Sequence, residues 1–156
     1  MAKDSKLEDL KKEYKKQPLP DFEAFNRNFQ ISGMSADEFS LNAIRKKIVD
    51  KLETFSEIIE NLLQPDVTIQ SLYESKAFDD EKRRDVFDIY KRLKRMERQS
   101  NILDIDATDK QNAEFINSAF NEWIKLKAKL KPILEEIKLS WDKEDIRISS
   151  EHGYFG

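Results

Sequence analysis

Seven apolar residues recur at steps of three or four between positions 41 and 62, and this spacing constrains the fold more than any other feature of the chain. The six steps between them sum to 21 positions, a mean of 3.5, which is the repeat of a helix face that packs in a bundle. Ser35 and Glu38 have the spacing of a capping box at a helix start, and Pro65 follows the last apolar residue. We predict a long helix over residues 35–63, buried through Leu41, Ile44, Ile48, Leu52, Phe55, Ile59 and Leu62.

Two further segments carry the same kind of pattern. The first runs from about residue 80 to residue 100, with Phe87 and Tyr90 on the edge of its apolar face. The second begins at Thr108, which makes a capping box with Gln111, and continues to about residue 141 because its periodicity persists past Pro132. Their expected buried residues are Val86, Ile89, Leu93 and Met96 in the first, and Ile116, Phe120, Trp123, Leu130, Leu134, Ile137 and Trp141 in the second.

Three short amphipathic segments complete the predicted architecture. They span residues 5–16, about 21–29 and 68–77, and each is too short to be a stable helix without docking. With only 3 Gly and 4 Pro in 156 residues, helix is favoured over strand throughout. The predicted fold is all-α: an antiparallel bundle of three long helices with one short connecting helix. Residues 1–33 form an N-terminal helical arm on this bundle, residues 34–144 the bundle, and residues 145–156 an aromatic tail.

Composition excludes several classes of function. The chain has no Cys and a single His, so disulfides, thiolate nucleophiles, zinc fingers and iron–sulfur clusters are excluded and a His-built metal site is not expected. No Gly-rich phosphate-binding motif is present. No apolar run approaches the roughly 20 residues that span a bilayer, and the first residues do not resemble a signal peptide. We expect a cytoplasmic protein with no membrane contact, metal or cofactor.

Charge is distributed unevenly. The formal net charge is -3, yet residues 81–101 hold eight basic and four acidic side chains. On a helix, four of the basic residues share one face: Arg84, Lys91, Arg95 and Arg98. Three interpretations follow: a solvated face paired internally through Asp88, a contact for an acidic protein, or a phosphate-binding surface for nucleic acid.

The last residues carry a likeness to a known family. Arg147 and His152 are separated by four residues, and Gly, Tyr and Phe follow. This spacing resembles the R-x4–6-H motif of HEPN-family ribonuclease and toxin domains, which are all-helical bundles of similar size. The resemblance implies that Arg147 and His152 act together on an RNA phosphodiester. Two alternatives are that Tyr154 and Phe155 pack onto the bundle, or that they anchor a protein partner.

These observations favour a non-enzymatic interaction or scaffold module over an enzyme. The expected partner is another protein, or a second copy of the chain, bound through Arg84, Lys91, Arg95, Arg98, Tyr154 and Phe155. Two alternatives stay open: an RNA-cleaving domain that uses Arg147 and His152, and nucleic-acid binding through the basic helix.

Overall fold

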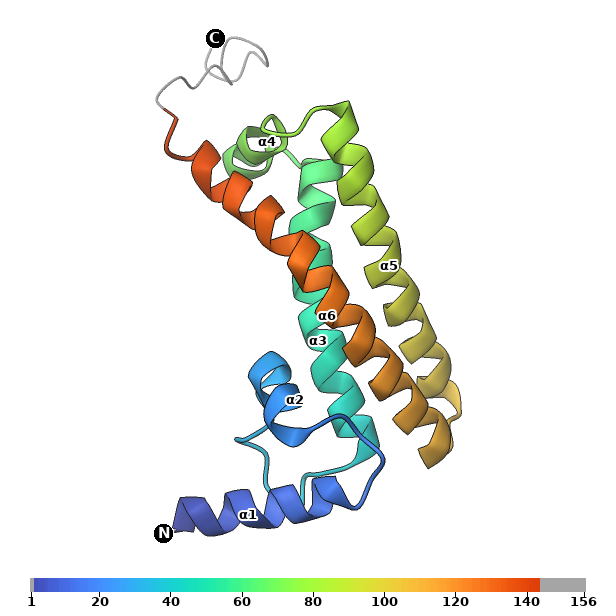
Figure 1. Ribbon diagram of the computed structural model, residues 1–156. Coiled ribbons are helices and arrows are strands. Elements are labelled where there is room, and N and C mark those ends of the chain that lie inside the picture. Colours follow the sequence, from blue (N-terminus) through green and yellow to red (C-terminus); the bar gives the residue numbers. More distant parts are fainter. Residues whose placement is uncertain (1, 144–156) are drawn as a thin grey trace. The chain divides into compact units, whose positions relative to one another are not determined.

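The computed structural model describes residues 2–143, and every regular element in this range is a helix (Figure 1). The three long helices α3, α5 and α6 pack together, which confirms the predicted all-α bundle. None of the helices in the described range is long and apolar enough to cross a membrane. The helices are α1 (Ala2–Lys15), α2 (Phe22–Phe29), α3 (Leu41–Leu63), α4 (Ile69–Ser75), α5 (Asp80–Ile105) and α6 (Asp109–Ser140).

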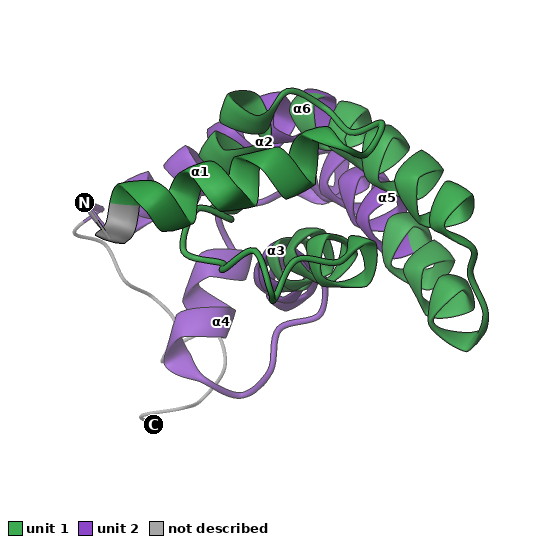
Figure 2. Cartoon of the chain, turned by 90° about the horizontal axis from the view of Figure 1, so that it is seen from below, with its two compact units in different colours: residues 1–53, 95–124 green, residues 54–94, 125–156 purple. Residues whose placement is uncertain are grey.

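The chain divides into two compact units, and each long helix contributes one segment to each of them (Figure 2). Unit 1 comprises residues 1–53 and 95–124, and therefore contains α1, α2, the first part of α3, the end of α5 and the start of α6. Unit 2 comprises residues 54–94 and 125–156, with the end of α3, α4, the start of α5 and the end of α6. The domain boundaries predicted at residues 33 and 144 stay predictions.

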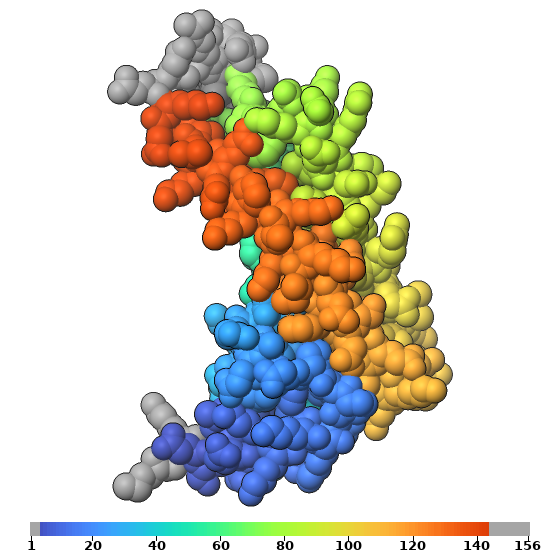
Figure 3. All heavy atoms as spheres, in the orientation of Figure 1, coloured from blue at the N-terminus to red at the C-terminus, as the bar shows by residue number. Residues whose placement is uncertain are grey.

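Unit 1 is built around aromatic side chains from α1, α2 and α6. Phe25 stacks on Phe120 at 5.9 Å between ring centroids, and Tyr14 meets Phe22 edge-on at 5.2 Å. In Figure 3 the side chains of α2 lie against the part of α6 that belongs to unit 1, and the ring contacts there join Phe25 to Phe120 and Phe29 to Trp123. Each buried Phe contributes about 1.5–3 kcal/mol, which compensates for the marginal stability of short helices. The other main buried residues are Leu10, Phe29, Ile31, Ile44, Ile48, Leu52, Phe115, Ile116 and Trp123.

The loop between α1 and α2 is fixed by a buried tyrosine. The Tyr14 hydroxyl donates a hydrogen bond to the carbonyl of Pro20 at 2.6 Å. Burial, and secondarily the charge of Asp21, raise the pKa of Tyr14 above its usual value, so the hydroxyl keeps the proton that it donates. Asp21 itself caps α2, because its carboxylate accepts from the backbone N–H of Ala24 at 3.1 Å.

Unit 2 has an aliphatic core to which the short helix α4 adds Tyr73. Thr68 is the N-cap of α4, since its hydroxyl accepts from the backbone N–H of Ser71 at 3.2 Å. The Tyr73 hydroxyl donates to the carbonyl of Ser140 near the end of α6, which ties α4 to that helix. The other main buried residues are Ile59, Leu62, Phe78, Val86, Ile89, Leu93, Leu126, Leu130 and Ile137.

The predicted start of α3 is wrong by six residues. The hydroxyl of Ser35 does accept from the backbone N–H of Glu38 at 3.2 Å, but this closes only a turn. The helix begins at Leu41, where Ser40 accepts from the backbone N–H of Ala43 at 3.0 Å. Phe39 explains the delay, because it leaves the helix line to pack against Tyr14 at 6.2 Å.

The start of α6 is set by residues close in sequence, whereas the end of α5 is set by packing against the core. The capping box of α6 is confirmed: the N–H of Gln111 donates to Thr108 Oγ1 at 3.2 Å, and the N–H of Thr108 donates to Gln111 Oε1 at 2.9 Å. The helix also continues through Pro132 as predicted. In contrast, α5 extends five residues past Ser100, because Leu103 adds one more buried position to its apolar face.

Candidate functional site

The exposed side of α5 in unit 2 carries a pair of aromatic rings. Phe87 and Tyr90 stack with their centroids 6.3 Å apart and an interplanar angle of 24°. The Phe87 side chain is 49% exposed, and Tyr90 is half-buried. Val86 is fully buried, and one residue along a helix turns the side chain by about 100°, which places Phe87 outside the core.

Two lysines lie over these rings. The Lys91 ammonium is 5.6 Å from the centroid of Phe87, and the Lys94 ammonium is 5.5 Å from that of Tyr90. Both pairs are four residues apart, so they are neighbours on the helix surface. A cation over an aromatic face is attracted by the ring quadrupole. We call Phe87, Tyr90, Lys91 and Lys94 the cation–aromatic cluster.

The predicted basic residues of α5 are all exposed. Arg84 and Lys91 belong to unit 2, and Arg95 and Arg98 to unit 1. Arg98 donates a hydrogen bond to the side chain of Asn101 at 3.0 Å. Acidic side chains accompany the cluster, because Asp85 and Asp88 are also exposed on the unit 2 part of the helix.

The aromatic half of this cluster was not predicted as part of a site. The sequence pattern places Phe87 and Tyr90 on the edge of the buried face, and the structure leaves Phe87 half exposed there. The available signal was the repeated spacing of an aromatic residue four positions before a lysine, at 87 and 91 and again at 90 and 94.

The end of α5, in unit 1, carries a second group of exposed apolar residues. Ile102 and Ile105 are 58% and 87% exposed, and they lie three residues apart on the helix. Leu103 between them is buried, so the helix contributes to the core of unit 1 while it presents both isoleucines to solvent.

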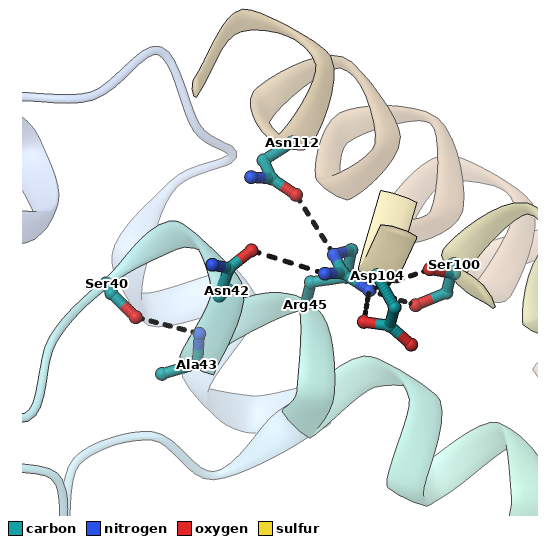
Figure 4. A network of polar contacts seen from close by, with 7 residues as sticks. All are labelled: Ser40, Asn42, Ala43, Arg45, Ser100, Asp104 and Asn112. Atoms are coloured by element: carbon teal, nitrogen blue, oxygen red, sulfur yellow. Dashed lines mark hydrogen bonds and ion pairs between the residues drawn. The ribbon is translucent and has the colours of Figure 1, made fainter. Parts of the chain in front are cut away.

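A buried arginine joins the three long helices within unit 1 (Figure 4). Arg45 of α3 is 2% exposed, and its Nη1 lies 2.7 Å from the carboxylate of Asp104 in α5. The same nitrogen donates to the carbonyl of Ser100 at 2.9 Å and to its hydroxyl at 2.5 Å. Nε donates to Asn112 of α6 at 3.0 Å, and Nη2 to Asn42 at 3.2 Å.

This arrangement identifies Arg45 as a structural residue. A buried charge is tolerated only when hydrogen bonds and an opposite charge replace its hydration, and here all the acceptors come from the chain itself. Asp104 is 49% exposed, so its carboxylate reaches the edge of the core without being fully desolvated. The sequence offered one hint, because Arg45 lies four residues after Leu41 and three before Ile48, on the apolar side of the helix.

A second polar group lies among the aromatic residues of unit 1. The Lys51 ammonium donates to the carbonyl of Asn28 and lies 5.3 Å from the ring of Trp123. Trp123 donates its indole N–H to the Asn28 side chain at 3.2 Å. The amide of Asn28 in turn donates to the carbonyl of Ala24 at 2.8 Å. Trp123 is buried as predicted, and these bonds satisfy its one polar atom.

The prediction that Trp141 belongs to the core is wrong. Trp141 lies just past the end of α6 and is 45% exposed. One face of its ring packs on Tyr73 at 4.4 Å, and its indole N–H donates to Glu74 at 2.8 Å.

Unit 1 also has surface pockets with polar and small lining residues. One of them, of about 580 Å³, lies between the end of α1 and the start of α6. Asn117 spans its wall, because its amide donates to the carbonyls of Pro18 at 2.7 Å and Ala113 at 2.8 Å. The other lining residues are Gln17, Asp109, Lys110 and Glu114.

Four predicted site residues lie outside the described range 2–143: Arg147, His152, Tyr154 and Phe155. The ribonuclease-like interpretation of the tail therefore stays a prediction. Among residues 2–143, no group of three or more acidic or His side chains is placed to hold a metal ion. Comparison with protein-family models, with curated proteins and with solved structures gave no significant match to this chain.

Proposed function

We propose that this chain is a non-enzymatic helical interaction module that binds another protein through the exposed side of α5. The observation that carries the proposal is that α5 presents large apolar side chains to solvent in both units. Phe87 does so in unit 2, and Ile102 and Ile105 do so in unit 1. The buried side of the same helix is already occupied by Val86, Ile89, Leu93, Met96 and Leu103.

Cations and aromatic rings lie close to these apolar residues along α5. Single exposed apolar side chains are ordinary on a protein surface, but apolar groups set among cations and aromatic rings are typical of protein interfaces. Aromatic residues and arginines supply most of the residues that dominate binding energy. Phe87 has Lys91 over its ring, and Arg84 precedes it by three residues. This composition supports protein binding.

The same cations support nucleic-acid binding less well. Phosphate binding needs a continuous basic surface, whereas Asp85 and Asp88 interrupt the basic residues on the unit 2 part of α5. The formal net charge of -3 and the sequence pI of about 5.4 also repel a polyanion at long range.

Affinity capture with matched variants tests the proposal. The full chain, with a tag, is incubated with lysate of its native organism as wild type, F87E, I105E and L139E, and the bound proteins are quantified by mass spectrometry. L139E is the control, because Leu139 of α6 is 60% exposed and the substitution adds the same charge away from α5. Far-UV circular dichroism verifies that each variant is folded.

We expect a reproducible set of proteins bound equally by wild type and L139E, with F87E or I105E reducing recovery by about fivefold or more, the effect of losing roughly 1 kcal/mol. Equal recovery with all four baits, or no specific recovery, contradicts the proposal. The partner could also be a second copy of the chain. Sedimentation of the pure protein tests this case, because self-association through α5 would raise its molecular mass.

A further inference from the structure

We infer that the end of α5 in unit 1 is a self-association surface, on which a second copy of this chain packs antiparallel about Ile102. The inference rests on the proposed function, because it names the occupant of one part of the exposed side of α5. It uses residues of unit 1 alone.

Two isoleucines stay uncovered at this end of the helix. Ile105 is 87% exposed and Ile102 is 58% exposed. They are three residues apart and are therefore neighbours on the helix surface. The core of unit 1 is served by the other side of the helix, where Ser100 and Leu103 are buried. Only a second molecule can remove both isoleucines from water.

A cation and an anion flank the two isoleucines. Arg98 lies four residues before Ile102, about one helical turn away on the same face. Asp106 lies four residues after Ile102, directly past the end of α5. Both charged side chains are exposed. We call Arg98, Ile102, Ile105 and Asp106 the Ile102 stripe.

Both charges of the stripe are available to a second molecule. Arg98 donates from Nη1 to the side chain of Asn101 at 3.0 Å, and a guanidinium carries five N–H donors, so this bond orients the group and leaves other donors for an acceptor. The side chain of Asp106 has no hydrogen bond or ion pair within residues 2–143. The nearby Asp104 differs, because its carboxylate is 2.7 Å from the buried Arg45.

The order of these groups makes the stripe complementary to itself. In a two-fold arrangement, a residue of one copy and the residue that it faces on the other copy exchange roles across the axis. With the axis at Ile102, Arg98 of each copy faces Asp106 of the other, because both lie four residues from the axis. The two Ile102 side chains then meet at the centre, flanked by Ile105 of each copy. A parallel arrangement would set like charges against each other, so charge complementarity identifies an antiparallel second copy as the occupant.

Sedimentation velocity of the full-length protein, from micromolar to millimolar concentration, tests the inference. I102E/I105E places carboxylates at the centre of the interface. R98D and D106R each set two pairs of like charges against each other in the dimer. R84D is the matched control for R98D, because it makes the same change at an exposed arginine of α5 in unit 2. Far-UV circular dichroism verifies that every variant is folded.

An equimolar mixture of R98D and D106R is the most specific sample. Each variant alone opposes like charges, but in a mixed dimer both contacts between position 98 and position 106 pair opposite charges again. General effects of net charge or of lost stability do not produce such a recovery.

We expect wild type and R84D to rise reversibly from 18.5 kDa toward twice that mass as the concentration increases. I102E/I105E, R98D and D106R should each weaken association by about tenfold or more, because the two-fold symmetry counts every substitution twice. The mixture of R98D with D106R should regain most of the wild-type association, and added salt should weaken it again, as it does for exposed charges.

A protein that stays at 18.5 kDa over the whole series overturns the inference. So does association that R98D or I102E/I105E leaves unchanged, and so does a mixture that associates no better than its two components.

The capture experiment separates this result from the proposed function. If the pure protein is monomeric and I105E still lowers the recovery of a cellular protein, a different protein covers this surface: the inference fails while the proposed function stands. If the protein self-associates through the Ile102 stripe, but F87E and I105E change the recovery of no other protein, the inference stands while the binding of a different protein fails.

Discussion

Arg45 and Asp104 form an ion pair of 2.7 Å in which the arginine is buried and the carboxylate is half exposed. The pair connects α3 with α5, and the same guanidinium reaches Asn112 of α6. The buried partner carries the greater energetic weight, because its charge has no access to water and depends on the chain for every hydrogen bond.

We therefore predict that R45A is more destabilising than D104N. Removing the guanidinium leaves a cavity and unpaired acceptors at Ser100 and Asn112, which should lower the free energy of unfolding by about 3–5 kcal/mol. Neutralising Asp104 removes the charge opposite the buried guanidinium but keeps the other hydrogen bonds of Arg45, so it should cost less, about 1–3 kcal/mol. Urea unfolding of both variants measures the difference, and equal midpoints would contradict the structural role given to Arg45.

The two serines before α3 differ in what they cap. Ser40 stands at the start of the helix, and Ser35 closes only a turn. S40A should lower the free energy of unfolding by about 1 kcal/mol, the usual cost of losing an N-cap. S35A should have less than half of that effect. If thermal or urea unfolding shows that S35A is more destabilising than S40A, α3 begins at residue 35, as the sequence pattern indicates.

The two tryptophans should differ in solvent access. Trp123 is 3% exposed, whereas Trp141 is 45% exposed. In W141F, which retains only Trp123, emission should be blue-shifted and acrylamide should quench it weakly. In W123F the emission of Trp141 should lie at longer wavelength and be quenched several-fold more strongly. Similar quenching constants in the folded variants would contradict the exposed position of Trp141.

The loop before α4 contains a carboxylate with an altered pKa. The hydroxyl and the backbone N–H of Thr68 both donate to Asp66, and these bonds lower the pKa of Asp66 below its ordinary value of 3.8. The folded state then binds fewer protons at this site than the unfolded state. Asp66 therefore contributes its full stabilisation above the unfolded pKa, and loses it as the pH falls through the lower, folded pKa.

Carboxyl NMR titration tests this directly. The pKa of Asp66 should lie below the ordinary value in wild type and rise toward it in T68A, because the hydroxyl bond is the largest cause of the shift. In S35A, which alters a hydroxyl far along the chain, the pKa should stay as in wild type. An Asp66 that titrates at or above the ordinary value in the folded protein would contradict the bonding of this loop.

Local signals predicted the helices because they depend on residues close in sequence. Thr108 and Gln111 cap α6 as their spacing indicates, and Asp21 and Thr68 start the short helices. The apolar repeat of α3 was also correct, since six of its seven residues are buried and Phe55 is half-buried. A helix start and its apolar face are set within a few turns, where the sequence carries all the relevant groups.

The candidate site could be predicted only in part. Exposure of Arg84 and Lys91 follows from charge and period, but the exposure of Phe87 does not. A helical wheel places Phe87 at the border of the apolar face. Whether a residue at this border is buried depends on how much of the helix surface the neighbouring helices cover. The same limit applies to Trp141, whose exposure depends on how much of its ring the distant residues Tyr73 and Glu74 cover.

The sequence by itself determined that the chain forms amphipathic helices, where most of them begin, and which of their faces are apolar, because these properties arise from neighbours three or four positions away. Only the tertiary structure decided that Arg45 lies inside and Phe87 outside. Two of the residues whose acceptors allow burial of Arg45, Ser100 and Asn112, are 55 and 67 positions away in the chain. Hydration of a charge or a ring is lost or kept according to which distant groups pack against it, and that packing is not encoded in any single segment.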